Sequence, residues 1–148
     1  MIDPQELIKT LSVEYLCETA ETRFRQLNED NPLIHMGKPF SDLNGVSETL
    51  QNMGHLLSEL QLGKSMTVLD FAAGTCWLSR FLTNLRCRTI SCDVSETALQ
   101  MGRELFSRFP PIGNKTYEPQ FLLFDGHKIN LPSESVDRII CHDGLHHI

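Results

Sequence analysis

The sequence predicts an α/β protein that combines a doubly wound parallel sheet with an N-terminal helical segment. From residue 65 onward, short apolar segments typical of buried strands alternate with segments of helical periodicity. Residues 1–64 show helical periodicity alone. Strands that alternate with helices pair in parallel through right-handed crossovers. We therefore divide the chain into a helical segment, residues 1–64, and a sheet-forming part, residues 65–148.

The N-terminal segment is predicted to form two helices. The first is expected to begin near Asp3, where Pro4 and Glu6 are typical of a helix start. Its apolar positions are Leu7, Leu11, Leu16, Ala20, Phe24 and Leu27. Residues 28–39 are rich in Asn, Asp, Pro and Gly, which predicts a loop. The second helix is expected to end at Gly63, and its apolar positions are Leu43, Val46, Leu50, Met53, Leu57 and Leu60.

The remaining chain is predicted to supply four strands and two helices. The strands are expected at residues 67–71, 88–93, 120–125 and 136–141. A helix is expected from Trp77 to Leu82, and a second is expected after Ser95, whose side chain can cap it. The inner face of that second helix is predicted to hold Ala98, Leu99, Met101, Leu105, Phe106 and Phe109. A loop is expected at residues 110–119.

Composition and charge exclude several classes of function. The chain has 148 residues, of which 41% are hydrophobic, enough for a core without disulfides. Its net charge of −6 argues against binding nucleic acid or an anionic membrane through bulk charge. It has no apolar run of ~18 residues, and its polar start is unlike a secretory signal. Five cysteines without Cys-x-x-Cys spacing favour a reducing, cytoplasmic compartment.

Acidic residues lie at or next to the ends of the first three predicted strands. Asp70, Asp93 and Asp125 should therefore border one crevice at the carboxyl ends of the sheet. Asp93 follows Asp70 by 23 residues, the spacing of an acid that binds a ribose diol. The turn 72–77 lacks Gly-x-Gly-x-x-Gly spacing, and the acid before it would repel a diphosphate. A cationic nucleoside without phosphate, such as S-adenosylmethionine, fits these residues better than a dinucleotide.

Four segments, in order, resemble class I S-adenosylmethionine-dependent methyltransferases. Residues 68–76, Val-Leu-Asp-Phe-Ala-Ala-Gly-Thr-Cys, resemble motif I, usually Val-Leu-Asp-x-Gly-x-Gly-x-Gly. Residues 93–95 resemble the acidic segment after motif I, and residues 124–126 resemble the adenine-binding Asp-Gly. Residues 131–140, followed by Leu145-His146-His147-Ile148, are similar to the ubiquinone/menaquinone-biosynthesis-like branch. The resemblance covers about residues 66–148.

This resemblance implies methyl transfer from S-adenosylmethionine to an unidentified acceptor, for which we expect a small molecule. It implies the first half of the family sheet, with strand order 3-2-1-4, and an N-terminal cap over the cofactor or the substrate pocket. The implied roles are Asp93 on the ribose, Asp125 at the adenine end, and Ala72 and Gly74 facing the methionine, with Asp70 ordering that loop. The full cofactor-binding set is Asp70, Ala72, Gly74, Asp93, Val94, Asp125 and Gly126.

The sequence departs from the motif at two positions and names no catalytic base. Ala72 replaces the first family glycine and Cys76 replaces the third. Cys76 is either a reactive thiol at a helix start or, as we expect, a small buried apolar residue. The three acids also have structural interpretations: Asp70 as a helix-capping or loop-ordering acid, Asp93 as a helix cap, and Asp125-Gly126 as a plain turn.

A cluster near the C-terminal end has the chemistry of a metal site. It consists of Cys141, His142, Asp143, His146 and His147. We expect no metal there, because the family resemblance accounts for Leu145-His146-His147 without one. An alternative is that one of these histidines acts as a base near the acceptor.

Two other functions remain open from the sequence: a non-catalytic S-adenosylmethionine-binding or scaffold protein, and a nucleotide-dependent oxidoreductase. The family sheet has seven strands, and four are found here, so we expect the chain to be a fragment that is poorly active alone. Val136, Ile139 and Ile140 would make the fourth strand an apolar edge. Such an edge predicts aggregation or self-association.

Overall fold

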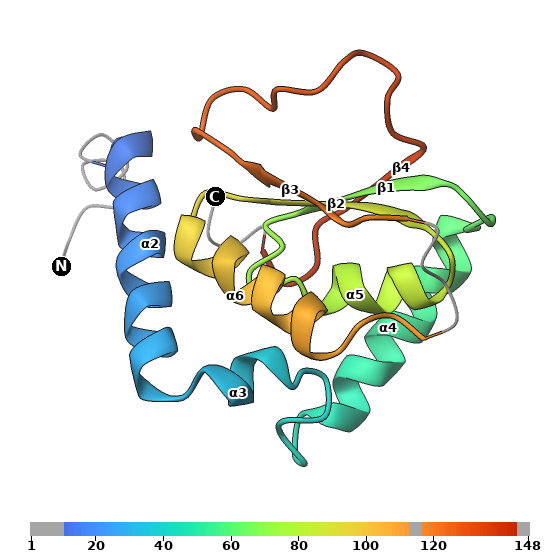
Figure 1. The fold of residues 1–148 in the computed structure, drawn as a ribbon, viewed down its shortest axis with the longest axis horizontal. Coiled ribbons are helices and arrows are strands. Elements are labelled where there is room, and N and C mark those ends of the chain that lie inside the picture. The colour runs from blue at the N-terminus through green and yellow to red at the C-terminus, as the bar shows by residue number, and fades with distance from the viewer. Residues whose placement is uncertain (1–10, 113–116, 145–148) are drawn as a thin grey trace, which may run out of the picture.

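Four parallel strands form a sheet flanked by helices, in a computed structural model that describes residues 11–112 and 117–144 (Figure 1). The strands follow the spatial order β3-β2-β1-β4, which confirms the predicted fold class and order. In chain order the elements are α2 (Val13–Asp30), α3 (Pro32–Met36), α4 (Val46–Leu60), β1 (Thr67–Phe71), α5 (Trp77–Asn84), β2 (Arg88–Asp93), α6 (Glu96–Arg108), β3 (Gln120–Leu123) and β4 (Arg138–Ile140).

The parallel register brings the carboxyl ends of the strands to one edge of the sheet. In β1, Asp70 lies opposite Ser91 of β2 and Ile140 of β4. Asp93, the last residue of β2, lies opposite Leu123, the last residue of β3. The loops that follow all four strands therefore leave the sheet on the same side, where α/β sheets place their ligand sites.

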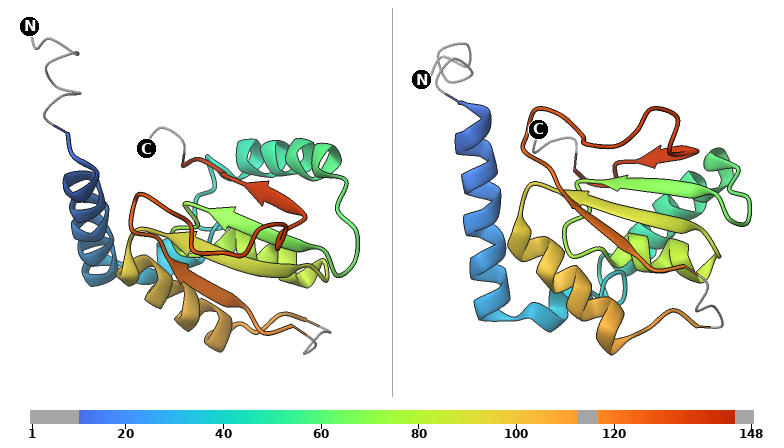
Figure 2. Two further views of the ribbon diagram at one scale, coloured as in Figure 1. Left: turned by 90° about the horizontal axis from the view of Figure 1, so that it is seen from above. Right: turned by 45° about the horizontal axis from the view of Figure 1, so that its top comes forward.

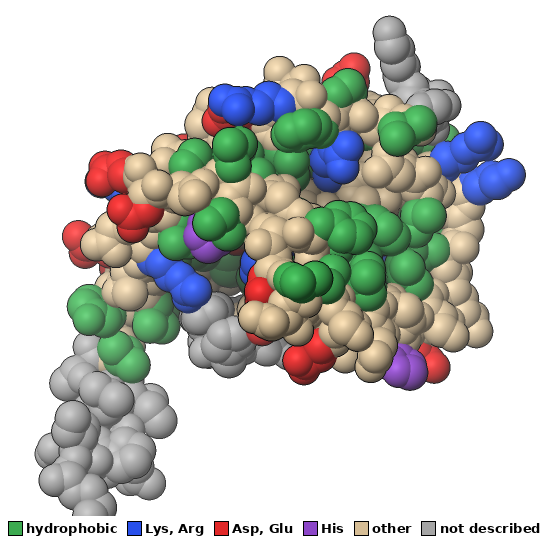
Figure 3. Space-filling view, turned by 90° about the horizontal axis from the view of Figure 1, so that it is seen from below, with side chains coloured by type: hydrophobic (Ala, Val, Ile, Leu, Met, Phe, Trp, Pro, Cys, Tyr) green, Lys and Arg blue, Asp and Glu red, His purple; other side chains and the backbone are tan. Residues whose placement is uncertain are grey.

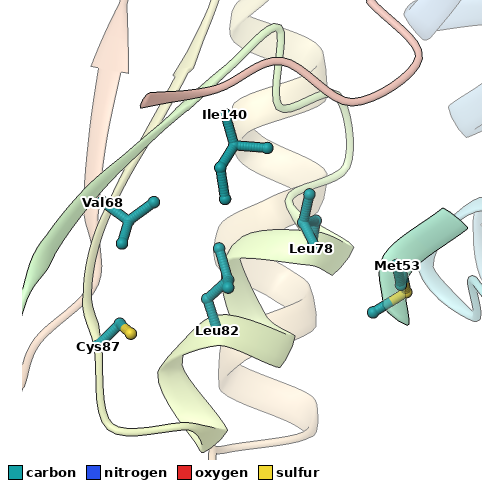
Figure 4. Close-up of a cluster of buried hydrophobic side chains, with 6 residues drawn as sticks. All are labelled: Met53, Val68, Leu78, Leu82, Cys87 and Ile140. Carbon is teal, nitrogen blue, oxygen red and sulfur yellow. The ribbon is translucent and has the colours of Figure 1, made fainter. Parts of the chain in front are cut away.

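Helices cover one face of the sheet, and a long connection covers part of the other. Helices α5 and α6 pack beneath the strands, with α4 beside α5 at the β4 side (Figures 1 and 2). Residues from α4, α5, β1 and β4 share one buried cluster (Figure 4), formed by Met53, Val68, Leu78, Leu82, Cys87 and Ile140. On the opposite face, the segment between β3 and β4 packs Phe124, Ile129, Leu131 and Val136 against a cluster that includes Leu69, Ile90 and Cys92.

Helix α2 stands at the end of the sheet, alongside α6 (Figure 2). Its N-terminus is capped by Ser12, whose side-chain oxygen accepts from the Tyr15 N–H at 3.2 Å. No residue of α2 is fully buried, so the helix covers its neighbours rather than entering the core. No helix in the described part of the chain has the length and apolar character needed to cross a bilayer.

Several helix boundaries differ from those predicted. The predicted first-helix start at Asp3, with its apolar residue Leu7, lies outside the described residues. The predicted loop 28–39 is wrong in its first part, because α2 continues to Asp30 and α3 follows. Asn31, at φ −161°, interrupts the helix, and Pro32 begins the next one. Proline suits a first helical position, where its missing N–H costs nothing.

The second helix is shorter than predicted at both ends. It begins at Val46, so Leu43 lies before it and is 89% exposed. It ends with Gln61 in a left-handed conformation, so Gly63 is not its cap.

Hydrophobic side chains gather on the lower face of the molecule (Figure 3). Beyond α6, the predicted core residue Phe109 is 49% exposed, because the helix ends before it.

The third and fourth strands are shorter than predicted, β3 ending at Leu123 and β4 spanning only Arg138–Ile140. Strand β1 and strand β2 have the predicted bounds, and Ser95 caps α6 as predicted by accepting from the Ala98 N–H at 3.0 Å. Strand ends outside the sheet centre depend on pairing partners, which local sequence patterns do not contain.

Candidate functional site

The loop between β1 and α5 alternates in and out of the left-handed backbone region. Ala72, Gly74 and Cys76 have φ values of 58°, 53° and 59°. These are the three positions at which motif I usually carries glycine. A side chain costs energy in this region, whereas glycine adopts it freely. The loop therefore keeps the backbone path that glycines allow, with Ala and Cys in strained conformations at two of the three positions.

Asp93 joins this loop to the start of α6. Its side chain is buried, with 5% exposure. Oδ2 accepts from the Gly74 N–H at 2.8 Å, and Oδ1 accepts from the Ser95 N–H at 2.9 Å. Burial raises the pKa of the carboxyl, and these N–H donors oppose the rise. The predicted site residues Asp93 and Gly74 are therefore in contact. Asp93 also supports the start of α6, which agrees with its alternative interpretation as a helix cap. Each carboxylate oxygen keeps lone pairs for further donors, such as ribose hydroxyls.

Asp70 points into the layer between the sheet and α5. It is 2% exposed, and its Oδ2 accepts from the Ser79 hydroxyl at 2.7 Å. That hydroxyl accepts in turn from the Ser91 hydroxyl at 2.7 Å. Burial raises the pKa of Asp70 to about 6. The carboxyl therefore anchors α5 to β1, and its effect on the intervening loop is indirect.

Asp125 and Gly126 form a tight turn after β3. The Asp125 Oδ1 accepts from the N–H groups of Lys128 and His127, both at 2.9 Å, which lower the pKa of this exposed carboxyl. Gly126 has φ 86°. The Phe124 N–H donates to the Asp93 carbonyl at 2.8 Å, so this turn begins next to Asp93. Asp125 and Gly126 thus have the turn geometry that was their alternative interpretation. The turn lies at the carboxyl edge of the sheet, where the cofactor site was predicted. Val94 lies half-buried in the neighbouring turn after β2.

Helix α2 contributes a carboxylate that sequence reasoning missed. Glu21 accepts from the Ser95 hydroxyl at 2.7 Å, from the Thr97 N–H at 3.1 Å and from the Thr97 hydroxyl at 2.6 Å. Burial alone would raise its pKa, but these hydrogen bonds lower it to about 2. Glu21 thus fastens α2 to the N-terminus of α6, two residues beyond Asp93.

Other side chains of α2 lie against both glycines of the predicted site. A Cβ built on Gly74 would lie 3.4 Å from Phe24 Cζ, and one built on Gly126 would lie 2.2 Å from Val13 Cγ1 and 3.1 Å from Cys17 Sγ. Val13, Cys17, Glu21 and Phe24 follow one another at spacings of four, four and three residues, which is a single helix face. That stripe was the sequence signal for the contact.

The Cys76 thiol has a packing role. Cys76 is fully buried, and burial raises its pKa far above that of a reactive thiol. A Cβ built on Gly102 of α6 would lie 2.4 Å from its Sγ, so the sulfur fills the space beside that glycine.

Among the described residues, no three His, Cys, Asp or Glu side chains are arranged to hold a metal ion. His146 and His147 of the predicted cluster lie outside those residues.

Comparisons with known proteins agree with this geometry. A solved S-adenosylmethionine-dependent methyltransferase from Aquifex aeolicus is 26% identical, with a TM-score of 0.53 over 63% of this chain and 48% of that chain. Magnesium protoporphyrin IX methyltransferase from Synechocystis PCC 6803 is 20% identical, with a TM-score of 0.58 over 100% of this chain and 65% of that chain. Phosphoethanolamine N-methyltransferase 1 from Haemonchus contortus is 18% identical, with a TM-score of 0.53 over 88% of this chain and 26% of that chain.

The likenesses to the Synechocystis and Haemonchus enzymes, at 20% and 18% identity, show the fold alone. The chain spans about half the length of the Aquifex aeolicus structure that it matches, and no curated protein matches it. A family model described as a methyltransferase domain matches residues 69–148, more than half of the chain. Strand order, the loop after β1 and the acid that ends β2 all agree with that match, and the chain belongs to the methyltransferase domain family.

Proposed function

We propose that this chain binds S-adenosylmethionine at the carboxyl edge of β1, β2 and β3, and that the protein transfers its methyl group to a small-molecule acceptor. The observation that carries the proposal is the contact between Asp93 and the Gly74 N–H at 2.8 Å. It places a carboxylate suited to a ribose diol against the loop whose backbone a ligand can approach. Family membership and the S-adenosylmethionine dependence of the Aquifex aeolicus relative support it.

The residues at this edge divide the cofactor between them. Asp93 receives the ribose hydroxyls, the backbone at Ala72 and Gly74 faces the methionine part, and the Asp125 turn borders the adenine end. Asp70 holds α5 in place behind the loop through Ser79. S-Adenosylmethionine supplies an activated methyl group. The protein's contribution is to hold the acceptor in line with it, an effect worth up to about 7–11 kcal/mol.

Residues 1–64 act as a cap in this proposal. The α2 stripe crosses the loop after β1 and the turn after β3, and Val13 fills the space above Gly126. In this proposal α2 therefore covers the adenine end of the ligand. The five cysteines are all unpaired, in keeping with the reducing cytoplasm proposed as the location. The ubiquinone-like subtype stays a prediction.

Calorimetric titration with S-adenosylmethionine and S-adenosylhomocysteine tests the cofactor assignment. Asp93→Asn keeps the size of the side chain but removes the charge and one acceptor oxygen. A hydrogen bond to a charged group is worth about 1.5–3 kcal/mol, so affinity should fall by about tenfold or more. Asp137→Asn is the matched control, because that carboxylate also accepts from a backbone N–H, Thr67 at 2.7 Å, but at the opposite edge of the sheet.

Equal affinities of wild type and Asp93→Asn for these ligands would contradict the assignment of Asp93 to the ribose. Absence of heat with both ligands would contradict the assignment of S-adenosylmethionine as the cofactor. Turnover of radiolabelled methyl groups separates an enzyme from a non-catalytic binding protein, since the latter would bind the cofactor and transfer nothing.

A further inference from the structure

A groove outside the cofactor edge lies between α4 and the segment that follows β4. Its volume is about 480 Å³, within the range of small-molecule sites. The described residues that line it are Gly45, Glu48, Thr49, Asn52, Leu56, Cys141, His142 and Asp143. The first five belong to α4 or directly precede it, and the other three follow β4.

The wall formed by residues 141–143 continues into the cofactor loop. The next residue, Gly144, is buried against Ala72: a Cβ built on it would lie 2.6 Å from the Ala72 Cβ. The His142 ring meets the Trp77 ring edge-on, with centroids 5.4 Å apart. Trp77 is the first residue of α5, directly after the loop. The groove and the proposed methionine end of the cofactor site thus share one segment of chain.

The chemistry of the lining selects one class of ligand. Glu48 and Asp143 supply two carboxylates, His142 supplies an imidazole, and Thr49 and Asn52 supply neutral hydrogen-bonding groups. None of the described lining residues is Lys or Arg. An anionic acceptor would meet repulsion here, whereas an ammonium group would pair with carboxylates. Leu56 offers an apolar surface to the body of a ligand.

We propose that this groove holds the methyl acceptor and that the acceptor is a small amine. This inference rests on the proposed function. The bound ammonium gives one proton to a ring nitrogen of His142 and becomes a neutral amine. Its nitrogen lone pair forms a bond to the methyl carbon while the carbon–sulfur bond breaks, and the electron pair stays on sulfur. Glu48 holds the amine through charge, and the Trp77 contact orients the His142 ring.

The test compares two probes of one shape and opposite charge, tyramine and 4-hydroxyphenylacetate. Their binding is followed by ligand-observed NMR and by calorimetry, and S-adenosylhomocysteine is titrated in parallel. We expect tyramine to bind in preference to the anion. Glu48→Gln should weaken tyramine by about fivefold or more, a modest factor for an exposed carboxylate, without changing the affinity for S-adenosylhomocysteine. Glu59→Gln is the matched control, on the same helix but outside the groove.

The outcomes separate this inference from the proposed function. Binding of S-adenosylhomocysteine with equal or no binding of the two probes would overturn the amine groove and leave the cofactor site standing. An unchanged tyramine affinity in Glu48→Gln would also overturn it. Tyramine binding without any S-adenosylhomocysteine binding would remove the acceptor role together with the proposed function.

Discussion

Replacing Ala72 by glycine should stabilise the protein, although it deletes a methyl group. At φ 58°, the Ala72 backbone is left-handed. That conformation costs an L-residue about 1–2 kcal/mol, which glycine avoids. Glycine lowers the free energy of unfolding by about 0.5–1 kcal/mol, because it gives the unfolded chain greater freedom. The loss of the half-buried Ala72 methyl group changes this balance little. We therefore expect Ala72→Gly to raise the free energy of unfolding by about 0.5–1 kcal/mol.

Urea denaturation at constant pH measures this change, and the next residue supplies the control. Ala73 is buried, with 7% exposure, and its φ is not positive. Ala73→Gly should lower the free energy of unfolding by about 1 kcal/mol or more, through lost burial and added chain freedom. Cys76→Gly should fall between the two, because it relieves a φ of 59° but removes a fully buried thiol. Equal destabilisation by Ala72→Gly and Ala73→Gly would refute the strain argument.

Two further predictions concern α2 and the edge strand. Glu21 has a folded-state pKa of about 2 against a usual 4.5, so its stabilisation is present above pH 4.5 and is lost as the pH falls toward 2. Between those pH values the unfolding free energy of the wild type should fall by up to about 3 kcal/mol more than that of Glu21→Gln. The control Glu18→Gln, which removes an exposed carboxylate, should follow the wild type. Parallel curves of unfolding free energy against pH for all three proteins would contradict this prediction. Ile139 is 61% exposed on β4, which pairs with β1 alone among the described strands. The proposed self-association through this edge should be detectable by light scattering after size-exclusion chromatography and should weaken in Ile139→Lys, and a wild type that stays monomeric at high concentration would count against it.

The two central strands were accessible from the sequence because their signals are local. Residues 67–71 and 88–93 are short runs bounded by turn residues, and both strands have the predicted bounds. The cap at Ser95 is likewise a contact across three residues. The alternation of strands with helices predicted parallel pairing, whereas the strand order 3-2-1-4 came from the resemblance to the methyltransferase family.

What the sequence by itself determined, then, is the parallel sheet and the bounds of its two central strands. The tertiary structure decided where the side chains near the strand ends point and what covers them. Asp70 and Asp93 look alike as acids near strand ends and share one face of the sheet, because Asp70 pairs with Ser91, two residues before Asp93. Their partners differ all the same: Asp70 accepts from Ser79 of α5, whereas Asp93 accepts from the Gly74 N–H of the loop. Glu21 reaches Thr97 across 76 positions of sequence, a contact that arises only when α2 docks on α6. Such pairings depend on packing between distant segments, which no local pattern of residues encodes.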